Sequence, residues 1–155
     1  MGEPVIASGH TLVTEWVPCV RATFYRPDEN PLFAVGATDD RGTLYGLDFG
    51  SARPRLLEVI HSESLAIRGN HVHRHSTETF TVLSGEIRMF LGCACPGRHL
   101  LQVRMVAGTT VGIAAGTPHA IFARTRSESV AAFDGDPRDD RDRVTLLEYR
   151  PPRTP

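Results

Sequence analysis

The chain is most informative at Gly69-Asn-His71-Val-His73-Arg-His75-Ser-Thr-Glu78-Thr-Phe-Thr-Val-Leu-Ser-Gly85, where three histidines and a glutamate lie within about one strand and a turn. Successive side chains of a strand point to opposite faces, so His71 and His73 project the same way, as two ligands of one ion must. Glu78 follows a short polar turn and can fold back toward them. The stretch is suited to holding a metal or to moving protons.

A second segment adds one more histidine. It reads Gly108-Thr-Thr-Val-Gly-Ile-Ala114-Ala-Gly116-Thr-Pro118-His119, a short apolar strand that runs into a Gly/Pro turn. His119 is therefore the natural fourth ligand beside His71, His73 and Glu78. Zinc, iron, nickel and manganese all accept imidazole and carboxylate, and four such ligands leave positions open for water or substrate. We expect one divalent transition metal in a working site.

These residues resemble the two motifs of the cupin superfamily. The first motif runs from a His-x-His pair to a glutamate and a closing glycine, here Gly85, and the second ends in Gly116 and His119. Three positions depart from the pattern, since Gly69 lies closer to the histidines, Ala114 replaces a proline and Ala123 replaces an asparagine. The resemblance covers roughly residues 43–149. It implies an all-β double-stranded β-helix, the cupin jelly-roll barrel, with the four residues as metal ligands.

The pattern along the chain is also that of an all-β protein, because short apolar runs alternate with Gly and Pro turns and no long segment has a helical period. We expect strands at residues 43–48, 55–61, 65–67, 72–75, 78–83, 86–91, 100–106, 110–113, 119–123, 130–134 and 144–149. Residues 1–42 form an N-terminal extension whose strands pack across a dimer, 43–150 the barrel, 134–143 a solvated loop and 151–155 a loose tail.

Composition excludes several partners. At 155 residues and 17.0 kDa the chain is most simply one domain, and a net charge of -1 gives no field that would recruit nucleic acid or an anionic membrane. No stretch approaches the ~20 apolar residues of a membrane span, and the start does not read as a signal peptide. Three cysteines argue against a disulfide framework. We expect Cys93 and Cys95 to be free thiols in a loop, and the protein to be cytoplasmic.

A narrower resemblance concerns the nucleotide-sugar ketoisomerases and epimerases and the cupin domains of capsule biosynthesis. It rests on Asp39-Asp40-Arg41-Gly42-Thr43-Leu44 and on the later Arg68-Gly-Asn-His-Val-His73. It implies an isomerase or epimerase that acts on a nucleotide-activated 4-keto sugar through an enediolate, in polysaccharide or natural-product biosynthesis. The resemblance also implies a homodimer. Arg68, Arg74 and Tyr45 are the candidate substrate-binding residues.

The resemblance leaves two versions of the proton transfer open. A histidine is a suitable base, because its ordinary pKa of ~6.5 lies near the working pH. An imidazole nitrogen bound to a metal cannot also take a proton. If a metal is bound, the base must come from His75, His61, Tyr45 or Tyr149. If the site is metal-free, His71 and His73 are the acid-base residues.

Two other functions fit the same four residues. Three histidines and a carboxylate also support oxygen chemistry in iron(II)-dependent oxygenases, so a metal-dependent small-molecule dioxygenase is one alternative. The other is a non-catalytic cupin that binds a sugar or another small molecule. Oxygen uptake after iron loading would identify the first, and ligand binding without turnover the second.

Overall fold

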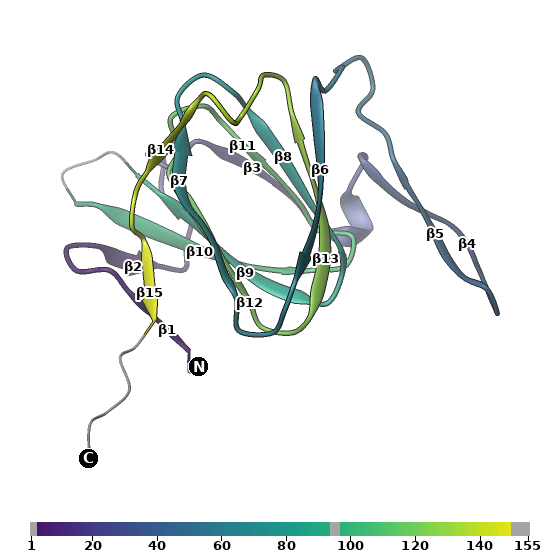
Figure 1. Cartoon of the computed structure of the whole chain (residues 1–155), viewed down its shortest axis with the longest axis horizontal. Coiled ribbons are helices and arrows are strands. Elements are labelled where there is room, and N and C mark those ends of the chain that lie inside the picture. Colours follow the sequence, from purple (N-terminus) through teal and green to yellow (C-terminus); the bar gives the residue numbers. More distant parts are fainter. Residues whose placement is uncertain (1–2, 94–96, 150–155) are drawn as a thin grey trace.

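Two mostly antiparallel sheets face each other in the computed structural model, which describes residues 3–93 and 97–149 (Figure 1). The first sheet has the order β14-β7-β12-β9-β10-β2 and the second the order β3-β11-β8-β13-β6. The strands of the first are β2 Thr11–Val13, β7 Ile67–His73, β9 Glu86–Gly92, β10 His99–Val106, β12 His119–Ala123 and β14 Arg141–Arg143. Those of the second are β3 Ala22–Tyr25, β6 Leu56–Ser62, β8 Glu78–Ser84, β11 Thr110–Ile113 and β13 Ser127–Phe133.

Two smaller strand pairs complete the fold. β1 (Pro4–Ile6) pairs with β15 (Leu147–Tyr149), and β4 (Phe33–Asp39) with β5 (Gly42–Leu47) in a hairpin that projects from the body (Figure 1). The one helical turn in the described part is the 3-10 helix η1 (Pro27–Glu29). Within residues 3–93 and 97–149 there is no helix with the length and apolar character that a membrane crossing requires. The predicted all-β jelly roll is confirmed, although its two sheets are not joined by hydrogen bonds into a closed barrel.

The core lies between the two sheets because their strands alternate as the sequence predicts. Ile87, Met89 and Leu91 of β9 are at most 1% exposed and pack against residues of the facing sheet such as Phe80. Phe90 points to the other side of β9 and packs in a second cluster beneath the C-terminal segment. Burial on both faces makes β9 a central strand that fixes its neighbours β10 and β12.

Most strand predictions hold, and the exceptions have local causes. β11 and β12 have the predicted bounds. The two short strands expected at residues 65–67 and 72–75 are wrong, because one continuous strand, Ile67–His73, overlaps both ranges and ends before Arg74. The strand expected at 144–149 is shorter, since only β15 (Leu147–Tyr149) forms there, and β14 (Arg141–Arg143) lies in the stretch expected to be a loop.

The N-terminal strands join the two sheets of their own chain. β2 pairs with β10 and β3 with β11. The boundary expected after residue 42 falls inside the β4–β5 hairpin, where Asp39 pairs with Gly42. The domain bounds and the exchange of these strands across a dimer stay predictions, and the tail at 151–155 lies outside the described residues.

The cysteine prediction is wrong at Cys93, which forms a disulfide with Cys19. The bond ties the segment before β3 to the end of β9, two parts of the chain that lie 74 residues apart. Cys95, the third cysteine, lies outside the described residues. An odd cysteine count did not exclude a pair, because spacing along the chain does not reveal which residues the fold brings together. The cysteines therefore no longer support the expectation of a cytoplasmic protein, because free thiols are typical of reducing compartments.

We expect the double variant Cys19→Ser/Cys93→Ser to be less stable than the wild type by about 2–4 kcal/mol, the range typical of a disulfide that closes a long loop. The measurement is urea unfolding of both proteins, with and without a reductant. The reductant should lower the stability of the wild type and leave the double variant unchanged. A wild type that is alkylated at both cysteines under denaturing, non-reducing conditions would contradict the assignment.

Candidate functional site

The four candidate ligands come together inside the jelly roll. His71 and His73 lie on β7, Glu78 begins β8 and His119 begins β12. Taking one ligand atom from each residue, these atoms all lie within 4.8 Å of one another. His73, Glu78 and His119 are at most 5% exposed, and His71 is half-buried. The structure therefore unites the ligands of two motifs, although Glu78 and His119 lie 41 residues apart in the sequence.

A β-bulge in β7 sets the register between β7, which carries His71 and His73, and β12, which carries His119. His71 pairs with His119, but the next pair is Gly69 with Ala120, so Asn70 is the extra residue of β7. Both bulge residues have positive φ, 78° at Gly69 and 55° at Asn70. A Cβ atom on Gly69 would lie 2.9 Å from the backbone oxygen of His119. The glycine near the histidines therefore lets β12 approach closely enough to deliver His119.

Asn70 is a positioning residue that the sequence did not reveal. Its Oδ1 accepts hydrogen bonds from the backbone N–H groups of Leu146 and Leu147, at 2.9 and 3.0 Å, and its Nδ2 donates to the Leu147 oxygen at 2.9 Å. Asparagine tolerates positive φ better than most residues. One side chain thus joins the bulge of the site to the C-terminal segment.

Charge within the cluster is organised around Glu78. Its Oε2 lies 3.0 Å from His119 Nε2 and 3.5 Å from His73 Nε2. Burial raises the pKa of Glu78, but the charge of His119, with a smaller contribution from His73, outweighs burial and lowers the pKa to about 2. For His119, burial lowers the pKa, but Glu78 outweighs it and the pKa is raised. The carboxylate is thus ionised at neutral pH.

The donor atoms fit a metal ion. Both ring nitrogens of His73 and Glu78 Oε2 are buried without a hydrogen-bond partner among the described residues. Burial, reinforced by His119 and His73, lowers the pKa of His71 to about 3, so its imidazole is neutral and keeps a lone pair. His119 Nδ1 donates to the Thr117 oxygen at 3.1 Å, in the tautomer that leaves Nε2 free to bind a metal. Buried polar atoms without partners are costly, and a cation would satisfy them.

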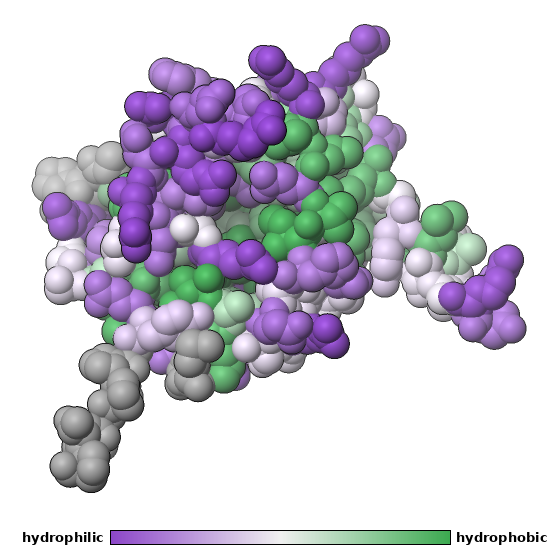
Figure 2. All heavy atoms as spheres, viewed as in Figure 1, coloured by the Kyte–Doolittle hydropathy of each residue, from purple (hydrophilic) through white to green (hydrophobic). Residues whose placement is uncertain are grey.

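The cluster opens into a cavity of about 150 Å³ between β6 and β7. In Figure 2, hydrophilic side chains gather over β7 and β14 and hydrophobic ones over β6 and β13, with a recess between them. The cavity lining outside the cluster includes charged residues on three strands and apolar residues from both sheets, among them Glu58, Arg68, Arg141, Ile60, Phe80, Ile121 and Phe133. Arg141 and Glu58 were not singled out from the sequence, because neither belongs to a recognisable motif.

Arg68 is the one predicted substrate-binding residue that lines this cavity. Its Nε donates to Ser62 Oγ at 2.9 Å and its Nη2 to the His61 oxygen at 2.7 Å, which holds the guanidinium beside β6. Arg74 instead forms ion pairs with Asp140 and Asp142 and does not line the cavity. Arg68 therefore contributes to the cavity, whereas Arg74 binds the segment that contains Asp140 and Asp142.

The residues that the sequence offered as bases beside a bound metal lie away from the cavity. β7 ends at His73, so His75 is exposed in the following bend. His61 pairs with Glu128 on the outer side of β6 and is 72% exposed. Tyr149 donates its hydroxyl hydrogen bond to the Leu65 oxygen and accepts one from the Ile67 N–H. Tyr45 packs on Phe33 in the projecting β4–β5 hairpin.

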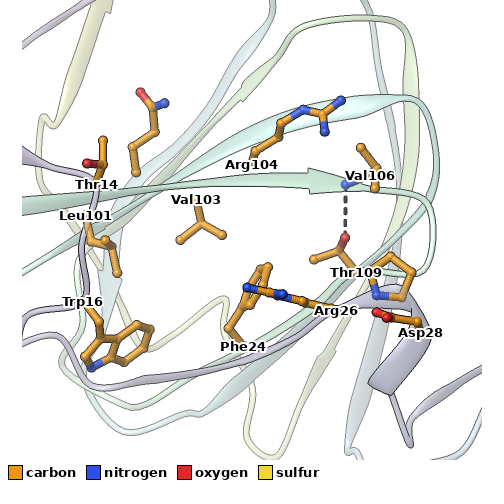
Figure 3. A pocket seen from close by; sticks show the side chains of 12 residues that line it. Thr14, Trp16, Phe24, Arg26, Asp28, Leu101, Val103, Arg104, Val106 and Thr109 are labelled. Atoms are coloured by element: carbon orange, nitrogen blue, oxygen red, sulfur yellow. Dashed lines mark hydrogen bonds between the residues drawn. The ribbon is translucent and has the colours of Figure 1, made fainter.

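A larger but more open depression lies elsewhere, on the side of β10 near η1 (Figure 3). Its volume is about 500 Å³, and Trp16, Phe24 and Arg26 line it together with Arg104. Arg104 is already paired with Glu86 at 2.7 Å. The depression shares no lining residue with the histidine cavity, and among the described residues the cluster that could hold a metal lies in that cavity. Its size alone does not make it the site of chemistry.

Asp140 supports the turn between the ligands and corrects the prediction of a solvated loop. It is 7% exposed and accepts hydrogen bonds from the backbone N–H groups of His75, at 2.9 Å, and Ser76, at 2.6 Å. Burial raises the pKa of Asp140, but these hydrogen bonds outweigh it and lower the pKa to about 2. The turn that leads from His73 to Glu78 is thus fixed from the opposite end of the chain.

We expect Asp140→Ala to lower the stability by about 2 kcal/mol, the usual worth of hydrogen bonds to a charged group, and the Tm by roughly 4–8 °C. Asp139→Ala, at the exposed neighbouring position, should leave the Tm nearly unchanged. Because the folded pKa of Asp140 lies below its ordinary ~3.9, the stabilisation is full above that pH and fades as the pH falls toward 2. Thermal melts of the three proteins at pH 7 and pH 3 check both points. A deficit of Asp140→Ala that does not shrink at pH 3 would count against this role.

Comparison with known proteins supports the fold. Residues 62–134 match the family model described as a cupin domain. No curated protein matches the sequence. Among solved structures, a 3,4-ketoisomerase from Helicobacter canadensis is 14% identical with a TM-score of 0.62, over 80% of this chain and 91% of that one. A sugar 3,4-ketoisomerase from Thermoanaerobacterium thermosaccharolyticum in complex with TDP is 15% identical with a TM-score of 0.61, over 79% and 87%.

A 3'-monoepimerase from Streptomyces bikiniensis in complex with dTDP-quinovose is 18% identical with a TM-score of 0.64, over 83% of this chain and 71% of that one. At such low identities the likeness establishes the shared fold.

Proposed function

Because this chain carries a cupin domain and has the fold of nucleotide-sugar ketoisomerases and epimerases, we propose that it is an isomerase or epimerase acting on a nucleotide-activated 4-keto sugar. The observation that carries the proposal is the cavity that holds three histidines, a buried carboxylate and two arginines. Such enzymes need no redox cofactor, since a 4-keto group acidifies the hydrogen on the neighbouring carbon. The reaction would serve polysaccharide or natural-product biosynthesis.

The size of the cavity suits the reacting part of such a substrate. At about 150 Å³ it is smaller than the ~300–1,000 Å³ of pockets that enclose whole drug-sized ligands. A sugar ring would enter the cavity, and the nucleotide would remain outside. Arg68 and Arg141 line the cavity on neighbouring strands and supply positive charge for the enediolate oxygen. Buried apolar residues such as Phe80 and Phe133 limit access of water to that oxygen.

We assign His71, His73, Glu78 and His119 as ligands of one divalent transition metal, zinc, iron, nickel or manganese. When bound, such an ion supplies a positive centre that polarises a substrate oxygen. The four side chains are then ligands and not proton carriers.

We further propose a homodimer, since β6 is a sheet edge and presents Leu57 and Val59, which are 55% and 67% exposed, on its outer side. The cytoplasmic location also stays a prediction. Disulfides are rare in reducing compartments, so a Cys19–Cys93 bond confirmed by unfolding with and without a reductant would count against it.

The proposal predicts hydrogen exchange at the carbon beside the ketone. We expect the protein, incubated in D₂O with TDP-4-keto-6-deoxyglucose, to incorporate deuterium next to the carbonyl and to form an isomer or epimer, as detected by NMR. Free 4-keto sugar without the nucleotide is the control for recognition outside the cavity. Oxygen uptake with iron and no exchange would favour the dioxygenase. Binding of the nucleotide sugar without exchange or product would indicate a binding protein.

A further inference from the structure

Glu58 occupies an inward position of β6 that the fold would normally give to an apolar residue. Along β6 the exposed residues are Leu57, Val59 and His61, and the alternate residues are half-buried. Leu56 and Ile60, the inward neighbours of Glu58, pack against the main core. Glu58 lines the histidine cavity with Ile60. A carboxylate between two core-facing side chains loses hydration, so its presence calls for a partner.

No such partner lies within ion-pair distance in residues 3–93 and 97–149. The ion pairs and side-chain hydrogen bonds found there do not include the Glu58 carboxylate. One cation with which it interacts at longer range is Arg138. The Arg138 guanidinium is already held by Asp136, through hydrogen bonds of 2.9 and 2.6 Å. Glu58 therefore faces the cavity with its acceptor oxygens available to a ligand.

Among the described residues that line this cavity, Glu58 is the acid-base group that remains once the metal ligands are set aside. The other charged lining residues are Arg68 and Arg141, which do not give up their protons in proteins. His75, His61, Tyr45 and Tyr149 all lie outside the lining. Carboxylates act as bases toward hydrogens next to a carbonyl in other enzyme folds. The elimination leaves one candidate.

We infer that Glu58 is the catalytic base, and that it returns the proton to the same face of the sugar, so that the reaction is a 3,4-ketoisomerisation and not an epimerisation. This inference rests on the proposed function. Inversion at carbon would require an acid on the opposite face of the ring, and the described lining offers no second group of this kind besides the ligands. Glu58 thus determines both the rate and the product.

The proton transfer is balanced in three steps. Glu58 takes the hydrogen from C3 as a proton, the C–H electron pair forms the C3=C4 double bond, and the carbonyl π pair moves to O4. The hydroxyl proton of O3 then passes to the adjacent O4. Finally the Glu58 carboxylic acid, after its proton has exchanged with solvent, protonates C4 while the O3 charge forms the new C3 carbonyl. The carboxylate is regenerated, and no oxidant or reductant is consumed.

The experiment compares the wild type with Glu58→Gln, Glu58→Asp and Glu128→Gln, using TDP-4-keto-6-deoxyglucose in D₂O and NMR of the product. Glu128 is an exposed glutamate paired with His61, so its variant is the matched control. We expect Glu58→Gln to slow the reaction at least 100-fold, in line with the usual contribution of a general base. Its Tm, its metal content and the Tm shift caused by the nucleotide sugar should equal those of the wild type. Glu58→Asp should restore part of the rate, and the wild-type product should be the 3-keto isomer.

The outcomes separate this inference from the proposed function. A wild type that neither exchanges hydrogen nor forms product overturns the proposed function, and the inference falls with it. A reactive wild type with a Glu58→Gln variant within about threefold of it overturns the role of Glu58 alone. A product epimerised at C3 with its 4-keto group unchanged overturns the one-face transfer. If Glu58→Gln is slow only because it no longer folds, Glu58→Asp at a normal Tm decides: activity above that of Glu58→Gln supports the carboxylate, and activity no higher than that of Glu58→Gln overturns it.

Discussion

His73→Ala should lose nearly all bound metal, retaining less than about a tenth of the wild-type content after dialysis. Losing even an outer-shell partner of a ligand typically costs 10–100-fold in affinity, so the loss of a ligand should cost at least as much. His73 is 4% exposed, and both of its ring nitrogens lack a hydrogen-bond partner in the described chain. Its lone pair is thus open to a metal, because no protein group already occupies it.

Elemental analysis of the purified protein is the first measurement, and the melting temperature with added metal is the second. A metal present at a hundred times its Kd stabilises the folded state by ~2.7 kcal/mol. That corresponds to a Tm increase of roughly 5–10 °C for a chain of this size. The wild type should show the increase and His73→Ala should not. Each protein is compared with its own metal-free form, so that the stability lost with the His73–Phe133 ring contact does not affect the comparison.

His75→Ala is the matched control, because it removes a histidine two residues further along the same stretch. His75 is exposed beyond the end of β7 and is not part of the cluster. Its replacement should change neither the metal content nor the Tm increase. Equal losses in both variants would contradict the assignment of His73 as a ligand. A wild type without metal, even after metal is added back, would return His71 and His73 to the role of acid-base residues.

The cluster itself could be predicted from the sequence because its signals are local. Alternation along a strand places His71 and His73 on one face. A Gly/Pro turn precedes His119, and the strand that follows the turn pairs with β7 so that His119 lies opposite His71. The same alternation predicts the buried face of β9. Such patterns depend on neighbours in sequence, so one chain is enough to read them.

The remainder of the site depends on which distant segments meet. Asp140 reaches the turn at Ser76 across 64 residues, and Cys19 meets Cys93 across 74. Glu58 is an ordinary glutamate in the sequence until β6 is placed at the edge of the cavity. His75 lies outside the cavity for the converse reason, because the alternation of a strand that would relate it to His73 stops where β7 ends. Long-range packing, and not local pattern, decides these residues.

The largest loss of stability is expected at Gly85, where Gly85→Ala should cost about 4 kcal/mol or more. Gly85 is the one residue between β8 and β9, and the chain passes there from one sheet to the other. Its φ is +80°, and an added Cβ atom would lie 2.3 Å from the Arg126 oxygen and 2.9 Å from Ser127 Cα. Real Cβ atoms do not approach backbone this closely, so one corner of the fold would have to move.

Gly116→Ala separates the steric clash from the strain in the backbone. Gly116 has nearly the same φ, +81°, but an added Cβ atom would meet nothing within 4 Å among the described residues. Its variant should therefore lose only the ~1 kcal/mol of an unfavourable φ. Urea unfolding of both variants gives the difference in their free energies of unfolding. Equal losses would mean that the backbone around Gly85 moves aside at no cost in stability.

We expect the β8–β9 connection at Gly85 not to move easily, because the β12–β13 connection is hydrogen-bonded to it. The backbone N–H of Glu86, the residue after Gly85, donates to Thr125 Oγ1 at 2.9 Å, and the Glu86 oxygen accepts from the Arg124 N–H at 2.9 Å. Thr125 belongs to the turn from β12 to β13, where the chain crosses back between the same two sheets. Moving one crossing thus breaks hydrogen bonds at both. Since β8 carries Glu78 and β12 carries His119, Gly85→Ala should also lower the metal content, whereas an effect confined to stability would show that the two ends of these strands are uncoupled.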